Sequence, residues 1–137
     1  MVALQVLVVL GVGRIAFGMP LGDAPLGLVL VTFALAFAAT AVGMLVAALA
    51  RTRSQAEGIA FVIAMVLALV GGSIMMLPEE GFLHSISQFT PHAHAIEGYL
   101  KLTSEGAGVI DVLPQVGLLA AVGTVIFLIA MWRFRFE

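Results

Sequence analysis

Three long stretches without a charged residue limit how this chain can fold more than any other feature. Residues 26–50, 58–77 and 112–132 contain almost only apolar side chains. A helix needs about 20 such residues to cross the roughly 30 Å hydrocarbon core of a bilayer. Each stretch reaches that length, so we expect three full membrane-spanning helices.

The composition also favours a membrane protein over a soluble one. Of the 137 residues, 62% are hydrophobic and 10% are charged, whereas soluble domains carry about 25% charged residues. The sequence has no basic patch for nucleic acid, and without cysteines it has no disulfide, thiol nucleophile or iron–sulfur ligand. We therefore expect an all-α, polytopic helical bundle in the lipid bilayer, with no cofactor and no nucleic-acid partner.

A fourth apolar run, residues 1–17, is shorter and contains Arg14. No basic residue precedes its apolar core, so it does not have the pattern of a secretory signal. We expect a short or partial first span. Arg14 lies near the end of the run, where its long side chain can reach the membrane surface. A functional arginine buried in the bundle is the alternative.

The basic residues predict the orientation. Arg51 and Arg53 follow the first full span, and further arginines follow the last one in residues 133–135. Two crossings separate these groups, so both lie on the same side, while acidic residues outnumber Lys101 on the other side. Basic residues concentrate in cytoplasmic loops. We expect a multi-pass protein of a prokaryotic plasma membrane, with a cytoplasmic C-terminus and residues 78–111 outside.

Small residues mark the expected helix contacts. Ala39, Gly43 and Ala47 recur every four residues, which leaves one helix face smooth enough for another backbone to approach. Gly71 and Gly72 lie within the next span, where the helix can bend or pack closely. We predict helix packing at these five positions. General packing, with no special role in function, is the plainer interpretation of each.

The external segment, residues 78–111, is too long for a turn and too short for a domain. Thr90 and Pro91 predict a helix start, because threonine caps helices and proline suits the first position. Residues spaced three or four apart predict one weakly apolar face on a short amphipathic helix at the outer interface: Ala93, Ile96, Leu100 and Thr103. Glu97 and Lys101 stand in the favourable i, i+4 order on the opposite side. With a short helix near residues 82–89, this segment predicts a re-entrant helical hairpin.

Histidines suggest another use of the segment, as a metal site formed by His84, His92 and His94. Residues two apart on a helix point about 200° apart, so His92 and His94 cannot share a metal if the helix starts at Pro91. An extended backbone would place them on one face. No His-Glu-x-x-His pattern is present. We expect no metal, and a membrane metalloenzyme is the less favoured alternative.

Four passages in order resemble the C-terminal half of permeases of the type-2 ABC exporter family. They are ALARTRSQAEGIA (residues 48–60), LVGGSIMMLP (69–78), ISQFTPHAHAIEGYLKL (86–102) and MWRFRFE (131–137). In that family a glycine-containing fifth span leads to a proline-containing external re-entrant hairpin. A sixth span with a basic cytoplasmic tail follows. The resemblance covers the chain from about Gly13 onward.

The resemblance implies the organisation of the chain and its partners. Such permeases have six spans, so residues 1–137 would form one transmembrane domain with part of the third span and all of the last three. Cytoplasmic ABC ATPase subunits and a second permease copy, or a homologous half, would be its partners. The chain itself has no Gly-x-x-x-x-Gly-Lys-Ser/Thr nucleotide pattern, so we expect a transport subunit and not an enzyme.

The resemblance also implies roles for particular residues. Arg51 and Arg53 would contact the ATPase or anionic headgroups, and Pro91, His94 and Glu97 would belong to an external gate. The apolar path between spans suits a lipid-like or amphipathic, drug-like cargo. A small scaffold or assembly subunit that transports nothing is the alternative function.

Overall fold

The computed structural model describes residues 2–18, 24–71, 82–87 and 90–134, and the regular structure in these ranges is helical, without a strand. The predicted all-α class is therefore confirmed. The elements follow one another as α1 (Val2–Phe17), α2 (Pro25–Leu49), α3 (Arg53–Val70), α4 (Phe82–Ser87), α5 (Pro91–Ser104), the 3₁₀ turn η1 (Ile110–Val112) and α6 (Leu113–Phe134).

Three of these helices are long and apolar enough to cross a membrane: α2, α3 and the continuous segment from η1 through α6. The shorter α1 is also apolar. The prediction of three full spans and one short span is confirmed. At 1.5 Å per residue, the 25 residues of α2 extend roughly 37 Å.

The third helix begins earlier than the predicted span of residues 58–77. Thr52 caps it by accepting a hydrogen bond from the backbone N–H of Gln55 at 3.2 Å. The cap starts the helix at Arg53, five residues before the uncharged stretch, because a charged first turn can lie at the membrane surface. At the other end α3 stops at Val70 with Gly71 as its cap. Residues 72–81, which include Gly72, lie outside the described residues.

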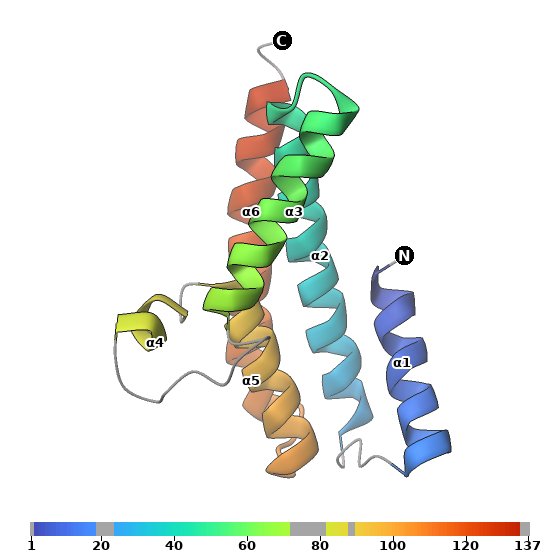
Figure 1. The fold of residues 1–137 in the computed structure, drawn as a ribbon. Coiled ribbons are helices and arrows are strands. Elements are labelled where there is room, and N and C mark those ends of the chain that lie inside the picture. The colour runs from blue at the N-terminus through green and yellow to red at the C-terminus, as the bar shows by residue number, and fades with distance from the viewer. Residues whose placement is uncertain (1, 19–23, 72–81, 88–89, 135–137) are drawn as a thin grey trace.

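In Figure 1, α2 and α6 run side by side in the same direction, and α5 lies along the half of the bundle where both of them begin. Two buried apolar clusters hold these three helices together. One contains Val31, Leu102 and Val112, and the other contains Ala34, Ala95 and Leu119. Farther along, Gly123 of α6 lets the backbone of α2 approach: a Cβ at Gly123 would lie 3.1 Å from Cα of Ala38.

The weakly apolar face of α5 is not the face that packs against the bundle. The buried residues are Pro91, Ala95, Gly98 and Leu102, whereas Leu100 is 52% exposed. Small side chains bring α5 close to its neighbours, and large apolar ones can contact lipid at no cost. Apolarity therefore does not distinguish the protein-facing side from the lipid-facing side.

On α2, a different set of small residues faces the bundle. Ala34, Ala38 and Ala41 are buried, whereas Ala39, Gly43 and Ala47 are exposed. A Cβ added to Gly43 would meet no atom within 4 Å among the described residues. Close packing on the Ala39–Ala47 face thus stays a prediction, and it would involve a surface outside the described residues.

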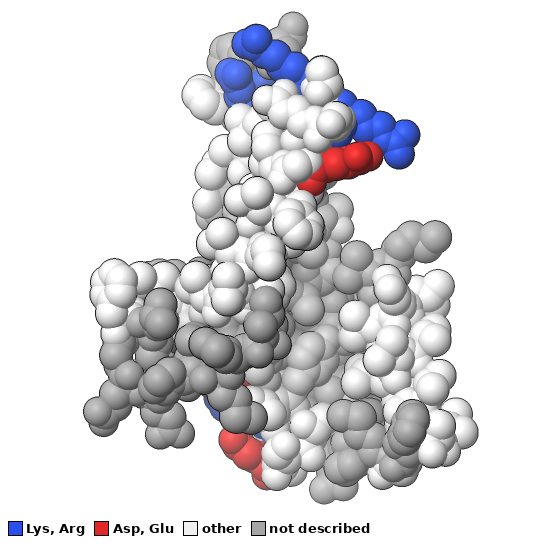
Figure 2. All heavy atoms as spheres, in the orientation of Figure 1, with Lys and Arg blue, Asp and Glu red and all other residues white. Residues whose placement is uncertain are grey.

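Three of the arginines lie together at one end of the bundle. Arg51 and Arg53 are at the turn between α2 and α3, and Arg133 is in the last turn of α6. Figure 2 shows basic side chains gathered at this end, with acidic atoms beside them. Helix α5, which carries Lys101, lies towards the opposite end (Figure 1).

Candidate functional site

The helix start predicted at Thr90 and Pro91 is confirmed. The Thr90 hydroxyl oxygen accepts a hydrogen bond from the backbone N–H of Ala93 at 3.3 Å, and the hydroxyl donates to the carbonyl of Ser87 at 2.7 Å. Pro91 occupies the first turn. Gly71 at the end of α3 lies against this turn, because a Cβ there would meet Cβ of His92 at 2.5 Å. The start of α5 is therefore closely packed under α3.

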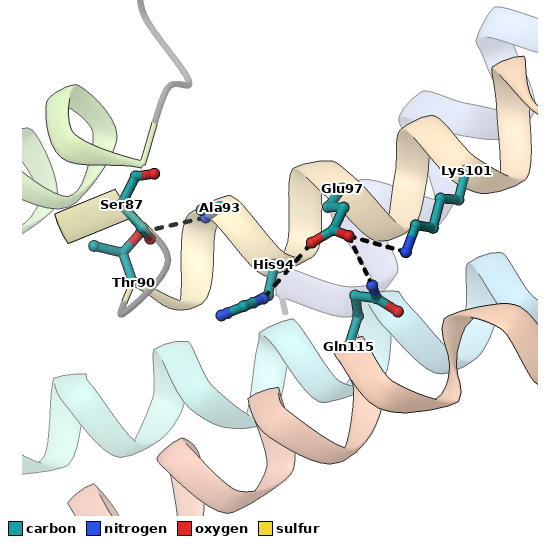
Figure 3. Close-up of polar contacts among 7 residues, drawn as sticks. All are labelled: Ser87, Thr90, Ala93, His94, Glu97, Lys101 and Gln115. Atoms are coloured by element: carbon teal, nitrogen blue, oxygen red, sulfur yellow. Dashed lines mark hydrogen bonds and ion pairs between the residues drawn. The ribbon is translucent and has the colours of Figure 1, made fainter. Parts of the chain in front are cut away.

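One turn farther, Glu97 joins α5 to α6 (Figure 3). Its carboxylate accepts a hydrogen bond from Nε2 of Gln115 at 3.0 Å and pairs with Nζ of Lys101 at 2.9 Å. Nδ1 of His94 lies 3.8 Å from the other carboxylate oxygen. The predicted Glu97–Lys101 pair is confirmed, and Gln115 extends it into a link between two helices.

The charges in this cluster stabilise one another. Burial raises the pKa of Glu97, but the hydrogen bond and positive charge of Lys101 and the hydrogen bond of Gln115 outweigh burial, so the pKa lies below its ordinary value. The hydrogen bond to Glu97 in turn raises the pKa of Lys101. Both side chains are therefore ionised at neutral pH, and the cluster holds an ion pair at the surface of the bundle.

Tyr99 links α5 to α2. Its hydroxyl lies 2.8 Å from the Thr32 hydroxyl, which donates its own proton to the carbonyl of Leu28 at 2.7 Å. Tyr99 must therefore donate to Thr32. Burial raises the pKa of Tyr99, so the phenol keeps its proton and the link at neutral pH.

Three successive residues thus fasten α5 in the groove between α2 and α6. Glu97 bonds α6, Tyr99 bonds α2, and Gly98 between them lets α5 approach Val31, since a Cβ there would lie 3.1 Å from that side chain. We call Glu97, Gly98 and Tyr99 the α5 anchor. The α5 anchor adds polar contacts to the two buried apolar clusters that pack α5 against α2 and α6.

His92 and His94 do not come together. His92 and His94 belong to one helix and face different neighbours: His92 packs against Gly71, and His94 lies beside Glu97. Among the residues that the structure describes, no three His, Cys, Asp or Glu side chains are grouped to hold a metal ion. The side chain of His84 lies outside that set.

A cavity of about 210 Å³ lies between α2 and α3. The first turn of α5 contributes Pro91 and His92 to its wall, and Ala39 and Gly43 of α2 also border it. The other wall residues are apolar: Leu35, Ala38, Val42, Val46, Ala60, Ile63, Ala64 and Leu67. Pro91, a predicted gate residue, therefore borders a hollow between spans, while His94 and Glu97 belong to the polar cluster.

At the basic end, the predicted contact residues are exposed. Arg53 pairs with Glu57 at 3.0 Å, with 92% and 67% of the two side chains exposed. The backbone N–H of Arg51 donates to Oε1 of Gln55 at 2.9 Å. The turn between α2 and α3 therefore presents exposed arginine side chains on a capped helix start. Arg14 lies away from this turn, in the last turn of α1, and is exposed as well.

Comparison with known proteins identifies the family to which this chain belongs. The sequence model of the ABC-2 family transporter proteins matches residues 1–132. The chain belongs to the ABC-2 transporter family. It is a multi-pass membrane protein and a membrane component of a transporter. This agrees with the resemblance seen in the order of its sequence passages.

Among curated ABC-2 proteins, the linearmycin resistance permease protein LnrN of Bacillus subtilis (strain 168) is 33% identical over 114 residues. The match covers 81% of this chain and 29% of LnrN, so the chain spans less than a third of the relative's length. No solved structure matches the chain.

The sequence analysis missed three residues of the polar contacts: Tyr99, Thr32 and Gln115. A signal was present for each. A polar side chain inside an apolar span needs a partner because hydrocarbon offers none, and Thr32 and Gln115 are such residues. Tyr99 is the chain's single tyrosine. The partners themselves could not be found without knowing how the helices pack.

Proposed function

We propose that this chain is part of the membrane-spanning permease of an ATP-driven ABC exporter and contributes its last spans. The ABC-2 family match over residues 1–132 carries the proposal. A second permease copy or homologous half would complete the path across the membrane, and separate cytoplasmic ATPase subunits would drive it. The C-terminus and the turn at Arg51–Arg53 would lie in the cytoplasm.

In this proposal the ATPase contacts the basic end. Arg51 and Arg53 are exposed beside a capped helix start, so their positions are fixed while their guanidinium groups stay accessible. Arginine forms bidentate pairs with carboxylates on a partner surface. Movement of a bound ATPase would then act directly on α2 and α3, the two helices that border the cavity.

The docking test is co-purification of the full permease with its ATPase subunit. Changing Arg51 and Arg53 together to alanine should weaken recovery of the ATPase roughly tenfold or more, as expected when two interfacial charged contacts are removed. Arg14→Ala removes a positive charge at the opposite end of the bundle and should leave recovery unchanged. Unchanged recovery with the double variant would remove these arginines from the interface.

We further propose that α5 is the outer gate. It begins beside the cavity at Pro91 and is fastened to both α2 and α6 by the α5 anchor, so unseating it would open the cavity toward the outer surface. Cargo passing between spans with apolar walls would be lipid-like or amphipathic. The only curated relative described above is a resistance permease named for linearmycin, which is in keeping with export of a toxic molecule.

A reversible lock tests the gate. The chain has no cysteine, so a Glu97→Cys, Gln115→Cys pair introduces the only two thiols, at positions whose native side chains touch. Oxidation should abolish efflux of an amphipathic dye by the assembled complex, and reduction should restore it. Each single cysteine variant is the control for loss of the native contact. Full efflux with the disulfide formed would mean that α5 need not move.

A further inference from the structure

Gln5 is the one polar side chain of α1 before Arg14. It is exposed, and its amide makes no hydrogen bond to any other residue that the structure describes. An amide that faces hydrocarbon without a hydrogen-bond partner is unfavourable, because lipid tails offer neither a donor nor an acceptor. A hydrogen-bonding group from outside the described residues would therefore stabilise Gln5.

The depth of Gln5 in the bundle restricts what that group can be. Figure 1 shows α1 beside the half of α2 that starts at Pro25, and the two helices run in opposite directions. Arg14 is in the last turn of α1, at the end where α2 begins. Gln5 precedes it by nine residues, so it lies about 13 Å deeper at 1.5 Å per residue. A charge at that depth is costly, so the partner of Gln5 is an uncharged polar group within the hydrocarbon.

Gln5 borders a groove of about 310 Å³ between α1 and α5. The other wall residues are Val6, Val9, Leu10 and Tyr99. The hydroxyl of Tyr99 is already bonded to Thr32, so the Gln5 amide is the free polar group of the wall. The volume is at the lower end of the roughly 300–1,000 Å³ of small-molecule pockets. A helix, about 10–12 Å across with its side chains, does not fit, whereas a hydrocarbon chain does.

We propose that this groove binds a hydrocarbon chain that carries an uncharged hydroxyl group along its length, and that the Gln5 amide hydrogen-bonds this hydroxyl. A hydroxyl at the end of a chain stays at the membrane surface, whereas one within the chain can reach the depth of Gln5. This deepens the proposed function, on which it rests only for the role of the ligand as cargo. Tyr99 belongs to the α5 anchor, so the bound chain contacts the element proposed as the outer gate.

Photolabelling of the full chain in lipid nanodiscs tests the site. The two probes are methyl stearate with a diazirine in its chain and the same ester with an added hydroxyl group at mid-chain. Mass spectrometry should find the hydroxylated probe on Val6, Val9 and Leu10, and unlabelled methyl hydroxystearate should displace it. This probe should label the three residues roughly two- to tenfold better than the plain ester, the range that one net hydrogen bond supplies.

Variants separate the hydrogen bond from the shape of the groove. Gln5→Leu should remove the preference for the hydroxylated probe, while both probes still label the groove. Adding Leu4→Gln to that variant moves the amide to an exposed position outside the groove wall, and the preference should not return. Val6→Phe should fill the groove and reduce labelling by both probes. Val8→Phe is its matched control on α1, since Val8 is exposed and outside the groove wall.

Equal labelling by the two probes, or a preference that survives in Gln5→Leu, would overturn the proposal. So would labelling of the groove no stronger than that of Val125 and Leu128, which are exposed on α6. Absence of label from the groove would also overturn it and would mean that another helix covers Gln5.

The labelling needs neither ATP nor the ATPase, so it is independent of the experiments on the proposed function. Specific labelling by a chain that fails in the efflux and docking experiments would refute the proposed function alone. The reverse result would refute the site alone.

Discussion

At the scale of single residues, hydrogen bonds between helices matter here because the helices are otherwise apolar. Hydrocarbon provides no competing water, yet measured hydrogen bonds between membrane helices average only about 0.6 kcal/mol. The α5 anchor combines two of them, at Glu97 and Tyr99 on either side of Gly98, with close packing at Gly98 itself. Each contact is weak by itself, so the anchor can hold α5 in place and still be broken during a transport cycle.

The bond between Tyr99 and Thr32 can be measured by a double-mutant cycle. Tyr99→Phe and Thr32→Val should each destabilise the fold, and we expect a coupling of about 0.6 kcal/mol between them. Unfolding in mixed micelles would supply the free energies. Thr124 donates to the carbonyl of Ala120 in its own helix, so Thr124→Val should be additive with Tyr99→Phe. Additivity with Thr32→Val as well would show that the two hydroxyls do not interact.

The lowered pKa of Glu97 predicts that the packing of α5 against the bundle depends on pH. Its pKa in the folded chain lies below the ordinary value of 4.5, so its contribution to stability is fully present above about pH 4.5 and is lost as the pH falls through the folded pKa. The protection factors of the α5 amides, which are exchange rates corrected for the slower intrinsic exchange at low pH, should therefore fall at acid pH, and Glu97→Gln should remove this dependence. His94 and Lys101 also face the carboxylate, so the same profile is measured in His94→Ala.

That variant controls for titration of the neighbouring histidine. If the acid-induced loss of protection persisted in Glu97→Gln but vanished in His94→Ala, the histidine and not the carboxylate would control the packing of α5. Equal loss of protection in all three proteins would assign the effect to general acid destabilisation.

At the scale of elements, apolar length predicted the spans, and capping residues predicted the start of α5. The packing faces could not be predicted the same way. In a soluble protein Leu100 would be expected to face the core, but here it can face lipid, while Ala95 and Gly98 are buried. Likewise Ala38 and Ala39 are adjacent and equally small. Ala38 is buried and packs against Gly123 of α6, whereas Ala39 is exposed. The choice between such faces depends on the partner helix, which the local sequence does not contain.

Glycine positions on α6 test which contacts set the distance between elements. A Cβ at Gly123 would meet Cδ1 of Phe37 at 2.7 Å and Cα of Ala38 at 3.1 Å. Gly123→Ala should therefore separate α2 from α6 and cost about 1–3 kcal/mol of unfolding free energy. A Cβ at Gly117 would meet nothing within 4 Å. Gly117→Ala on the same helix should be neutral or stabilising by up to about 1 kcal/mol, and a large cost there would reveal a contact with another chain.

At the scale of the whole molecule, the two ends differ in charge and in structure. One end is a short capped turn with exposed arginines, and the other carries α5 with the Glu97–Lys101 pair. The arginine-rich end is the one expected in the cytoplasm. The cavity lies between α2 and α3, and the arginine turn joins these two helices. The first turn of α5 borders the cavity from the opposite end. A force applied to the arginine turn could thus reach the cavity through two helices without passing through a loop.

This arrangement requires one orientation, and the absence of cysteine makes the orientation measurable. Single replacements Ser54→Cys and Glu105→Cys place one thiol at each end, both at exposed positions. A membrane-impermeant maleimide added to intact cells should label Glu105→Cys, and it should label Ser54→Cys only after the cells are opened. The unmodified chain, which has no thiol, is the control for background labelling. Labelling of Ser54→Cys in intact cells would reverse the orientation, and the arginine turn could then not meet a cytoplasmic ATPase.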